Sequence, residues 1–564
     1  MPQSRRRALS AVAAAALLAA VCAQPPQVES EPKRFSPEAA KRARLVLGTT
    51  TGITLAKKIG RGRPPPLRSV LGAREEATLV DEPPPGPLAQ LARAFVLLMI
   101  FMPVILTAPF ALVPFFRSRV WFWLIKSCLA SAGTAFIKWG QWAACRPDMF
   151  PERLCAQLAD LHSRAPVHGF AHTRREVERS LGARLEEVFE SFDEAPLASG
   201  SIAQVHRATY KGRAVAVKVR HPAVVSRIVV DFALMNYLAS ASERIGLRWL
   251  NLRASVGQFS DTMVAQTRLD IEGEHLDRFN WNFGTGQWRD CDFPRVLRPN
   301  GVAPTPSVLV ESFEPGELVA RYTVEQTFGT SDAAALDPRL AHFIVSRGED
   351  LYLKMLLVDN LMHADMHPGN ILLDSAATAS PTGGAAAGGP RRASPRIVML
   401  DVGMVARLTK HEAEAFIGLL QAIGAGDGRA AARVVLRFSE APQEYCSSAE
   451  ERAAFAEDMH ALFLERCRGY GTNVQFGEVL RGVLSLVRRH RVSLDANYMT
   501  LVMNVLCLES MALVLLPGYN VLDAAKPLLV AHKRLPRPLF RLLLPTVQSL
   551  KRLSDRWWAA RHRG

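Results

Sequence analysis

The chain has 564 residues, 49% of them hydrophobic and 22% charged, so it can bury a large core and should contain more than one structural unit. Its formal net charge of +16 favours anionic partners such as nucleotide phosphates or acidic lipid surfaces. Nucleic acid is not an expected partner, because the sequence has no zinc-finger spacing, no RNA-binding aromatic signature and no basic helix joined to a heptad zipper. The eight cysteines form no CxxC pair, which is typical of reduced thiols in an intracellular compartment.

The amino terminus has the composition of a targeting segment. Arginines occupy positions 5 to 7, an Ala/Leu-rich run extends over residues 11–20, and no acidic residue occurs before Glu29. These features are typical of a mitochondrial presequence, but a secretory signal with a small-residue site near Ala23 fits them locally as well. Residues 60–87 are rich in Pro, Gly and Arg, so we assign residues 1–87 to a targeting segment and linker.

A long apolar segment follows the linker. No charged residue occurs from Ala94 to Phe116, and this length is enough for a helix to cross the apolar interior of a bilayer. Arginines flank the run, and Trp121 stands at a position suited to a membrane interface. We therefore expect residues 88–117 to form a transmembrane or membrane-embedded segment. The alternative is a hydrophobic helical hairpin packed on the following domain.

Residues 118–190 are expected to form a mostly helical extension, because amphipathic patterns such as PERLCAQLADLH occur in them. This extension contains the tetrapeptide KWGQ at residues 138–141. By itself the tetrapeptide indicates only a surface lysine and a turn glycine.

Residues 198–222 predict a β-hairpin that can hold phosphate groups. Small residues at its tip would let backbone amides approach a phosphate without obstruction by side chains. Lys218 stands on the returning strand, where it can supply a point charge for the α- and β-phosphates. A lone lysine in an edge strand can also serve solubility, but acidic motifs further along the chain favour the phosphate role. The hairpin residues that we expect around the nucleotide are Leu197, Ala198, Ser199, Gly200, Ser201, Ile202 and Val205.

A lysine at such a site needs a carboxylate partner. Glu274 is our candidate, since a helix is predicted to begin near it, and Glu272 is the fallback. The residues between Lys218 and this helix, 223–262, are expected to be inserted helices.

A second structural prediction concerns the strand after this helix. Residues 307–311 predict a buried strand that leads into a hinge. The backbone from Glu311 to Phe313 would then be placed to read adenine.

The stretch HADMHPGNILL, residues 363–373, carries an acid and an amide five residues apart, Asp365 and Asn370. A second apolar run, IVML, then leads into Asp401 and the sequence DVG. This layout matches the catalytic and metal-binding loops of protein-kinase-like phosphotransferases, with Val402 in place of the usual Phe. We expect Asp365 to be the acid–base residue and Asn370 and Asp401 to bind Mg²⁺, which prefers oxygen ligands.

Two other interpretations of this stretch were weighed. His363 and His367 are four residues apart, a spacing that can place zinc ligands on a helix face. Pro368 and Gly369 follow at once, which indicates a loop before a strand and argues against zinc. Isolated Asp, Asn and Gly residues between strands are also ordinary turn formers.

Four motifs together resemble the UbiB / aarF-domain family of atypical kinases, which includes mitochondrial proteins linked to coenzyme Q. KWGQ resembles the Lys-x-Gly-Gln signature of this family, and ASGSIAQVH at 198–206 resembles its alanine-rich replacement of the kinase glycine loop. HADMHPGN at 363–370 and DVG at 401–403 resemble its catalytic and metal loops. Within the family, the hydrophobic segment ahead of KWGQ is most similar to that of an animal mitochondrial type.

The resemblance implies an α+β fold, namely a two-lobed protein-kinase-like fold with a helical N-terminal extension and a preceding membrane segment. The N-lobe would cover residues 191–313 and the C-lobe 314–535. Residues 375–395, rich in Ala, Gly, Ser and Pro, would form a disordered insert. Residues 536–564 would be a basic tail, which is either solvated or resting on anionic lipid. Helices are predicted from about residue 411 onward.

The resemblance also implies ATP and Mg²⁺ as cofactors and work as an ATPase or lipid-related kinase. The expected partners are lipids of the mitochondrial inner membrane and isoprenoid-quinone or lipid-synthesis enzymes, and a secretory-pathway membrane is the alternative location. Two alternatives to this activity remain, an inactive nucleotide-binding scaffold and a kinase for a protein or small-molecule acceptor.

The KWGQ helix would cover the place where kinases bind peptide, with Lys138 and Gln141 reaching toward the nucleotide as regulatory residues. One position departs from the family pattern. Arg268 stands where the family often has an acid for the lysine, which would leave Lys138 with Asp270 alone.

Overall fold

The computed structural model of the protein describes residues 64–67, 86–144, 150–159, 161, 167–244, 252–284, 288–328, 336–375, 395–438, 446–494, 496–541 and several positions from 543 to 551. Three predicted features fall outside these residues. They are the targeting segment up to residue 63, residues 376–394 of the expected insert, and the last thirteen residues of the basic tail.

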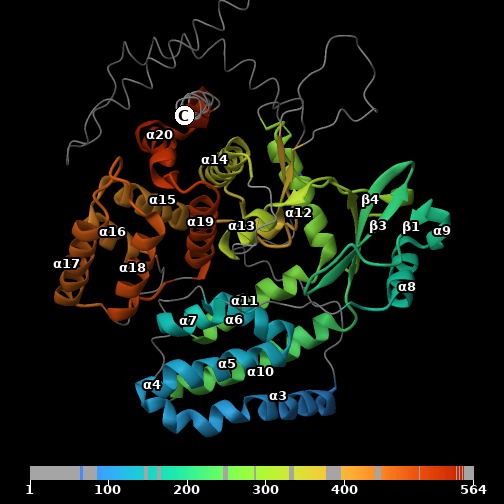
Figure 1. Ribbon diagram of the computed structural model, residues 1–564, viewed down its shortest axis with the longest axis horizontal. Coiled ribbons are helices and arrows are strands. Elements are labelled where there is room, and N and C mark those ends of the chain that lie inside the picture. The colour runs from blue at the N-terminus through green and yellow to red at the C-terminus, as the bar shows by residue number, and fades with distance from the viewer. Residues whose placement is uncertain are drawn as a thin grey trace, which may run out of the picture.

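Two lobes and a layer of N-terminal helices make up the described chain (Figure 1). This confirms the predicted α+β, kinase-like architecture with a helical extension. The domain boundaries that we assigned from the sequence remain predictions. Each of the three parts has its own cluster of buried apolar side chains.

The N-lobe contains a mixed-length antiparallel sheet in the order β1-β3-β4-β6, with β2 added on β3. Lys211 and Gly212 connect β3 to β4 with positive φ values of 51° and 70°, as a two-residue hairpin turn requires. Apolar side chains of β4 and β6 alternate with polar ones, so one face of the sheet packs on α8 and the other faces the C-lobe. The elements of this lobe are α8 (Phe170–Leu181), α9 (Leu185–Val188), β1 (Ser191–Phe192), β2 (Ala198–Ser199), β3 (Ala203–Tyr210), β4 (Arg213–Arg220), α12 (Leu269–Phe283) and β6 (Val308–Ser312).

Two helices are inserted between β4 and α12, as the sequence predicted. They are α10 (Val224–Arg244) and α11 (Leu252–Gln266), and they pack on each other and on the N-terminal layer. That layer consists of α3 (Pro87–Thr107), η1 (Ala108–Leu112), α4 (Pro114–Phe116), η2 (Arg117–Trp121), α5 (Phe122–Ala132), α6 (Thr134–Ala144) and α7 (Glu152–Ala159).

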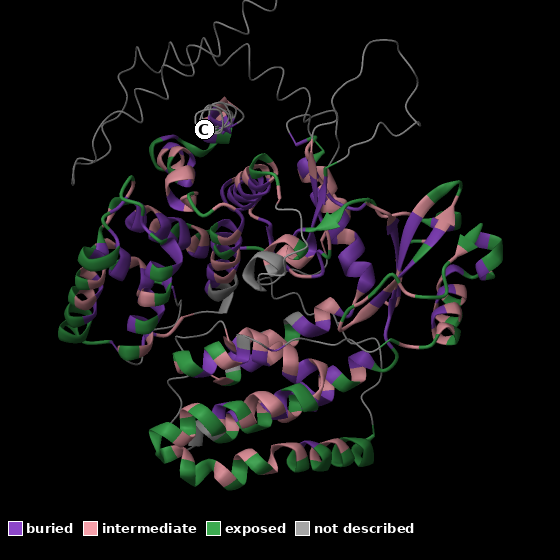
Figure 2. Ribbon diagram, in the orientation of Figure 1, coloured by how far each residue is buried: buried purple, intermediate pink, exposed green. Residues whose placement is uncertain are grey.

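The predicted membrane segment forms the first arm of a helical hairpin, whose second arm is η2 and α5. The run Pro87–Leu112 is long and apolar enough to cross a membrane, and most of its large apolar side chains are exposed (Figure 2). The chain then turns back, and α3 packs along α5. Arg93 of α3 donates to both carboxylate oxygens of Asp231 on α10, at 2.7 and 2.9 Å. One side of α3 is therefore fixed to the protein, and its other side presents an apolar surface of the kind that suits lipid.

The C-lobe combines two small sheets with many helices. Antiparallel β8 and β11 form one sheet, and β5-β10-β9-β7 form the other. The strands are β5 (Cys291–Asp292), β7 (Glu317–Leu318), β8 (Met362–His363), β9 (Ile371–Asp374), β10 (Arg396–Met399) and β11 (Val405–Ala406). The helices are α13 (Val319–Phe328), α14 (Pro338–Lys354), η5 (Met355–Asp359), η6 (Pro368–Asn370), α15 (Lys410–Ala425), α16 (Gly428–Val435), α17 (Ala449–Arg466), α18 (Phe476–Arg489), α19 (Ala496–Leu515) and α20 (Val521–Arg534), whereas η4 (Pro299–Gly301) lies beside the N-lobe sheet.

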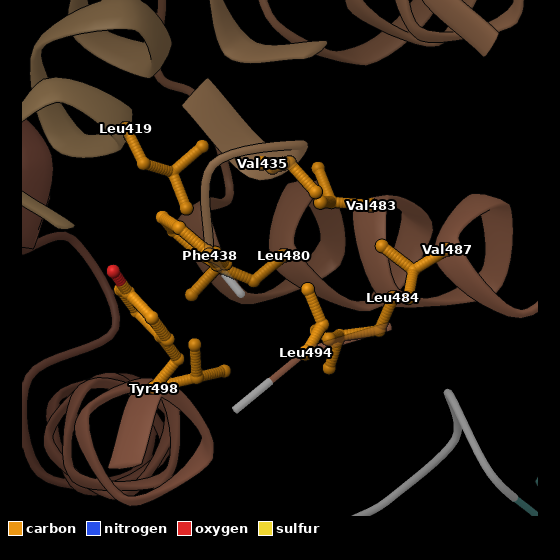
Figure 3. A pocket seen from close by; sticks show the side chains of 10 residues that line it. Leu419, Val435, Phe438, Leu480, Val483, Leu484, Val487, Leu494 and Tyr498 are labelled. Carbon is orange, nitrogen blue, oxygen red and sulfur yellow. The ribbon is translucent and has the colours of Figure 1, made fainter. Parts of the chain in front are cut away.

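Apolar side chains fill the space between α15, α16, α18 and α19. Figure 3 shows Leu419, Phe438 and Tyr498 among the side chains that meet there, and the rings of Phe438 and Tyr498 stack with centroids 3.9 Å apart. The cavity that they leave measures about 10 Å³, which is no more than the space of one water molecule. This part of the C-lobe is therefore core and not a ligand site. Helix α19 contributes Tyr498, Leu501 and Leu508 to this core.

Lys551, in the predicted basic tail, is buried against α14. Its Nζ atom lies 2.9 Å from Glu349 Oε1 and 3.1 Å from Asp350 Oδ1, and the three side chains are no more than 4% exposed. Burial raises the pKa of Glu349 to about 7 despite the opposing effect of Lys551. Part of the predicted tail is thus docked on the C-lobe, because buried carboxylates are stabilised by this cation.

The substitution Lys551→Met is expected to lower the free energy of unfolding by about 3–5 kcal/mol, since it leaves two buried acids without their shared cation. Urea denaturation would measure the loss. Lys410→Met is the control, because Lys410 is 76% exposed and 4.0 Å from its acid. Equal effects of the two substitutions would contradict the docking of the tail.

Candidate active site

Lys218 lies at the centre of a group of buried acids. Its Nζ atom is 2.7 Å from Glu272 Oε1 and 3.3 Å from Glu311 Oε1, and none of the three side chains is more than 13% exposed. The alternation along β4 places Lys218 on the face opposite the buried Val217 and Val219. These ion pairs join β4, β6 and α12 at the face of the sheet that looks toward the C-lobe.

Glu272, and not Glu274, is therefore the carboxylate partner of Lys218. Our first candidate was wrong and the fallback is correct. The reason is helical geometry: α12 begins at Leu269, and two residues along a helix turn a side chain about 200° around the axis. Glu272 faces β4, whereas Glu274 lies on the other side of α12.

The acids around Lys218 carry more negative charge than the lysine balances. Burial raises the pKa of Glu272 to about 7, and burial also raises the pKa of Glu311. Burial would lower the pKa of Lys218, but the charges of Glu272, Glu311 and Asp401 raise it well above its ordinary range. Lys218 is therefore charged, and its electrostatic interaction with Asp401 connects the N-lobe sheet to the DVG loop.

Asp401 follows β10 and adopts a positive φ of 44°, which residues other than glycine seldom do. Its Oδ1 atom accepts a hydrogen bond from the Gly403 amide at 3.3 Å. Desolvation by the surrounding protein raises the pKa of Asp401, but Lys218, the Gly403 amide and Lys138 together bring it below its ordinary value. Asp401 is therefore an ionised carboxylate that interacts with Lys218.

Asn370 and Asp365 are held together in the catalytic loop. Asn370 Nδ2 donates to Asp365 O at 3.0 Å and to Asp365 Oδ2 at 3.3 Å. This leaves Asn370 Oδ1 as the atom of the amide suited to bind a cation. The Leu400 amide donates to the Asn370 carbonyl at 2.8 Å, so the loop is tied to the end of β10 just before Asp401.

The buried side chain of His363 connects the catalytic loop to the segment that leads into Asp401. Its Nδ1 atom accepts from the Asp365 amide at 3.1 Å, so the proton is on Nε2, which donates to the Leu400 carbonyl at 3.2 Å. The side chain is fully buried, and burial lowers its pKa, which keeps the ring neutral. Both ring nitrogens are engaged, so the pair His363 and His367 does not form a zinc site. Within the described part of the chain, no group of three or more His, Cys, Asp or Glu side chains is placed to hold a metal ion.

The small residues 198–201 lie in β2 and at the tight turn between β2 and β3. We call this turn the hairpin tip. Ala198 pairs with Val205, and the Gly200 amide donates to the Ala203 carbonyl at 2.9 Å. Val205 in turn pairs with Lys218, so its side chain lies on the same face of the sheet as the lysine. The tip consequently stands beside the Lys218 cluster, as the sequence led us to expect.

Two histidines support this tip from behind. His221 Nε2 donates to the Gly200 carbonyl at 2.9 Å, so its Nδ1 accepts from His168 Nδ1, which lies 2.7 Å away. Burial lowers the pKa of both rings, that of His168 to about 4. Neutral histidines therefore fix the position of the tip, a role that the sequence gave no signal for.

Two backbone amides of the expected hinge have partners within the protein. The Ser312 amide donates to Arg295 O at 2.9 Å and the Phe313 amide to Ala214 O at 3.4 Å. The side chain of Glu311 takes part in the Lys218 cluster. Recognition of adenine by the backbone of this segment stays a prediction, and these two amides are already engaged.

Asn504 of α19 is a site residue that the sequence analysis missed. Its Nδ2 atom donates to His363 O at 2.7 Å, and its Oδ1 atom accepts from the Met366 amide at 3.3 Å. The side chain is 2% exposed and fixes both sides of Asp365. A lone asparagine within the apolar run YMTLVMNVLCLE was the available signal.

Comparison with known proteins shows to which family the chain belongs. A family model described as the ABC1 atypical kinase-like domain matches residues 160–435. A probable serine/threonine-protein kinase, abkC of Dictyostelium discoideum, is 32% identical over 485 residues, which cover 77% of this chain and 68% of that protein. The chain belongs to the ABC1 atypical kinase-like family.

Similar proteins also occur in two yeasts and in a bacterium. Mitochondrial ABC1 family proteins of Schizosaccharomyces pombe and Saccharomyces cerevisiae are 27% and 28% identical, covering 78% and 73% of this chain and 70% and 68% of theirs. A probable protein kinase UbiB of Pseudomonas entomophila is 27% identical over 76% of this chain and 75% of its own. The predicted UbiB / aarF resemblance is thus confirmed. The solved complex of Rv3197 with erythromycin from Mycobacterium tuberculosis covers 67% of this chain and 91% of its own, but at 17% identity and a TM-score of 0.35 the likeness is too distant for an argument.

The ABC1 motif KWGQ lies on α6 of the N-terminal layer. Lys138 is close enough to Asp401 for its charge to lower the pKa of that carboxylate, as a reach toward the cleft requires. Gln141 Nε2 donates to the Leu161 carbonyl at 2.7 Å. The expectation that both side chains reach toward the nucleotide stays a prediction.

Arg268 changes the surroundings of the ABC1 lysine. Its guanidinium donates to both carboxylate oxygens of Asp270, at 2.9 and 2.8 Å. We expected Lys138 to be left with Asp270 as its only acid. In the structure its two oxygens are bound by the arginine that replaces the usual acid, because residues 268 and 270 flank the start of α12.

The substitution Asn504→Ala is expected to loosen the catalytic loop, since it leaves His363 O and the Met366 amide buried without partners. We expect a loss of about 1–3 kcal/mol in unfolding free energy and faster amide hydrogen exchange over residues 363–366. Mass spectrometry of exchanged peptides would measure this. Ser510→Ala, at an exposed position of the same helix, should change neither quantity, and equal exchange in both variants would refute the role of Asn504.

Proposed function

We propose that this protein binds ATP with Mg²⁺ between its two lobes and acts as an atypical kinase or ATPase in mitochondrial coenzyme Q and lipid metabolism. The observation that supports it most is the convergence of side chains from distant parts of the sequence. Lys218 of β4 is paired with Glu272 of α12 and interacts electrostatically with Asp401. The catalytic loop with Asp365 and Asn370 is bonded to the strand that ends at Asp401.

The charges of this site support a divalent cation as part of the bound nucleotide. Two lysines, Lys138 and Lys218, stand among four carboxylates, so the formal charge is −2. The four acids are Glu272, Glu311, Asp365 and Asp401. A nucleotide alone is a polyanion and would be repelled, whereas Mg²⁺ offsets both sets of charges. Asn370 and Asp401 would hold Mg²⁺, because an amide and a carboxylate oxygen at adjacent loops suit this hard cation.

The other residues of the cleft have roles that follow from their positions. Lys218 would bind the α- and β-phosphates, oriented by Glu272. The hairpin tip would cover the phosphates with its backbone amides. Asp365 would orient the acceptor hydroxyl or water and take its proton, since phosphoryl transfer depends on positioning and electrostatics more than on covalent chemistry.

The location that we propose is the mitochondrial inner membrane. Two yeast relatives are named mitochondrial, and the family includes UbiB, which supports a role in coenzyme Q metabolism. The exposed apolar side of α3 supports attachment to lipid.

Nucleotide binding can be tested by calorimetry on the full chain. We expect Lys218→Ala to weaken binding of Mg²⁺–ATP about 10–100-fold, because a charge-assisted hydrogen bond contributes roughly 1.5–3 kcal/mol. Asp401→Ala and removal of Mg²⁺ with EDTA should have effects at least as large. Lys211→Ala, an exposed lysine at the turn of the same hairpin, is the control and should bind normally. Unchanged affinity in Lys218→Ala would show that the nucleotide site is wrongly assigned.

Turnover can be tested separately from binding. Asp365→Asn should retain Mg²⁺–ATP binding and lose hydrolysis or phosphoryl transfer in a phosphate-release assay, since the amide cannot accept the proton. If the wild type binds the nucleotide but neither hydrolyses nor transfers phosphate, the protein acts as a scaffold instead.

The two glutamates of α12 provide a matched pair. Glu272→Gln should weaken Mg²⁺–ATP binding about 5–10-fold, because Lys218 is then drawn toward Glu311 and Asp401. Glu274→Gln should leave affinity within about twofold, as expected of a residue that does not orient the lysine. The opposite ranking of the two variants would overturn the assignment of the ion pair.

A further inference from the structure

Helix α12 carries a buried histidine that is directed at the DVG loop. His275 is 2% exposed, and its Nδ1 atom lies 2.8 Å from the carbonyl oxygen of Val402. A carbonyl oxygen can only accept, so Nδ1 carries the proton and donates it. This hydrogen bond joins the helix that pairs with Lys218 to the loop that begins at Asp401.

The peptide group between Val402 and Gly403 is held at both ends. Its carbonyl accepts from His275, and its N–H group, the Gly403 amide, donates to Asp401 Oδ1 at 3.3 Å. A trans peptide group is planar, with its C=O and N–H pointing in opposite directions, so a bond that fixes one end also orients the other. Hydrogen bonds in such a chain polarise one another, which makes the N–H a better donor. His275 thus acts on the carboxylate of Asp401 through one peptide group.

The backbone of Asp401 makes this support necessary. Its φ of 44° lies in the left-handed region, which costs free energy for a residue other than glycine. The hydrogen bond from the amide two residues ahead to its own Oδ1 forms an Asx turn, which offsets part of this cost. The turn closes only while the Gly403 amide faces the carboxylate, and His275 stabilises that orientation.

The same side of α12 serves two parts of the site. Glu272 and His275 are three residues apart on the helix, so their side chains are neighbours. Glu272 pairs with Lys218, whereas His275 bonds to the DVG loop. An apolar side chain would fill the buried space of the imidazole without the cost of desolvating a polar ring. The feature that distinguishes His275 from ordinary packing is therefore its N–H donor.

We propose that His275 is a positioning residue for the Mg²⁺ site, and that its Nδ1–H group holds Asp401, through the peptide between Val402 and Gly403, in the orientation in which this carboxylate binds the cation. The inference rests on the proposed function, because it takes Asp401 as a ligand of Mg²⁺. His275 would contact neither the nucleotide nor the ion. Removing a hydrogen-bonding group that supports a metal ligand typically costs about 10–100-fold in metal affinity or activity.

Titration of Mg²⁺ into the full chain with a fluorescent ATP analogue tests this assignment. His275→Leu fills much of the space of the ring and removes the donor, so the half-saturating concentration of Mg²⁺ should rise about tenfold. His275→Asn keeps a donor, because its Nδ2 atom can take nearly the position of Nδ1, and should stay within about threefold of the wild type.

Phe283→Leu is the control for a general loss of stability. Its ring is 3% exposed on the same helix and packs on Trp288 and Phe293, with centroids 5.1 and 5.2 Å away. This variant should unfold at a lower temperature and keep the Mg²⁺ dependence of the wild type.

Equal Mg²⁺ dependence in the wild type and in His275→Leu would overturn the positioning role and leave the proposed function in place. An equal rise in His275→Leu and His275→Asn would also overturn it, since the donor would then not matter. A wild type that binds no nucleotide at any Mg²⁺ concentration would instead overturn the proposed function, and this inference with it. Amide hydrogen exchange over residues 401–404 without nucleotide should be faster in His275→Leu than in His275→Asn, and equal exchange would contradict the support of the loop.

Discussion

The ion pairs of Lys218 are the interaction on which the arrangement of the lobes around the cleft depends. One ammonium group joins β4 to α12 and β6 and interacts with Asp401 across the cleft. Burying these charges costs free energy unless the geometry is good, and burial raises the pKa values of Glu272 and Glu311. The proposed magnesium-chelated nucleotide would bring a cation to this group of acids, which a nucleotide alone would not.

In the C-lobe, neutral and buried groups position the catalytic loop and the segment that leads into Asp401. His363 connects the Asp365 amide to the Leu400 carbonyl, and Asn504 holds the backbone on both sides of Asp365. On the opposite side of the cleft, His221 and His168 support the hairpin tip in the same way. Uncharged partners can fix these loops without adding to the field in which the acids and lysines act.

The N-terminal layer packs an exposed apolar helix and Lys138 into one unit. Helix α3 is fixed to α10 by Arg93 and Asp231, and α6 carries Lys138, whose charge acts on Asp401. Trp139 follows Lys138 on the same helix and lines an apolar cavity of this layer. Successive residues of a helix point in directions about 100° apart, so α6 contributes both to the surroundings of Asp401 and to this cavity.

The sequence by itself determined the fold class and the family and named candidate site residues, because short motifs such as HADMHPGN and DVG place acids and amides at spacings that local structure preserves. Only the tertiary structure decided which partners meet. It selected Glu272 over Glu274 through the starting point of α12, bound Asp270 to Arg268, and turned Gln141 to the Leu161 carbonyl. It also revealed Asn504, more than 130 residues from the loop that it holds. Such contacts depend on helix rotation and packing between segments far apart along the chain, and no local pattern records these.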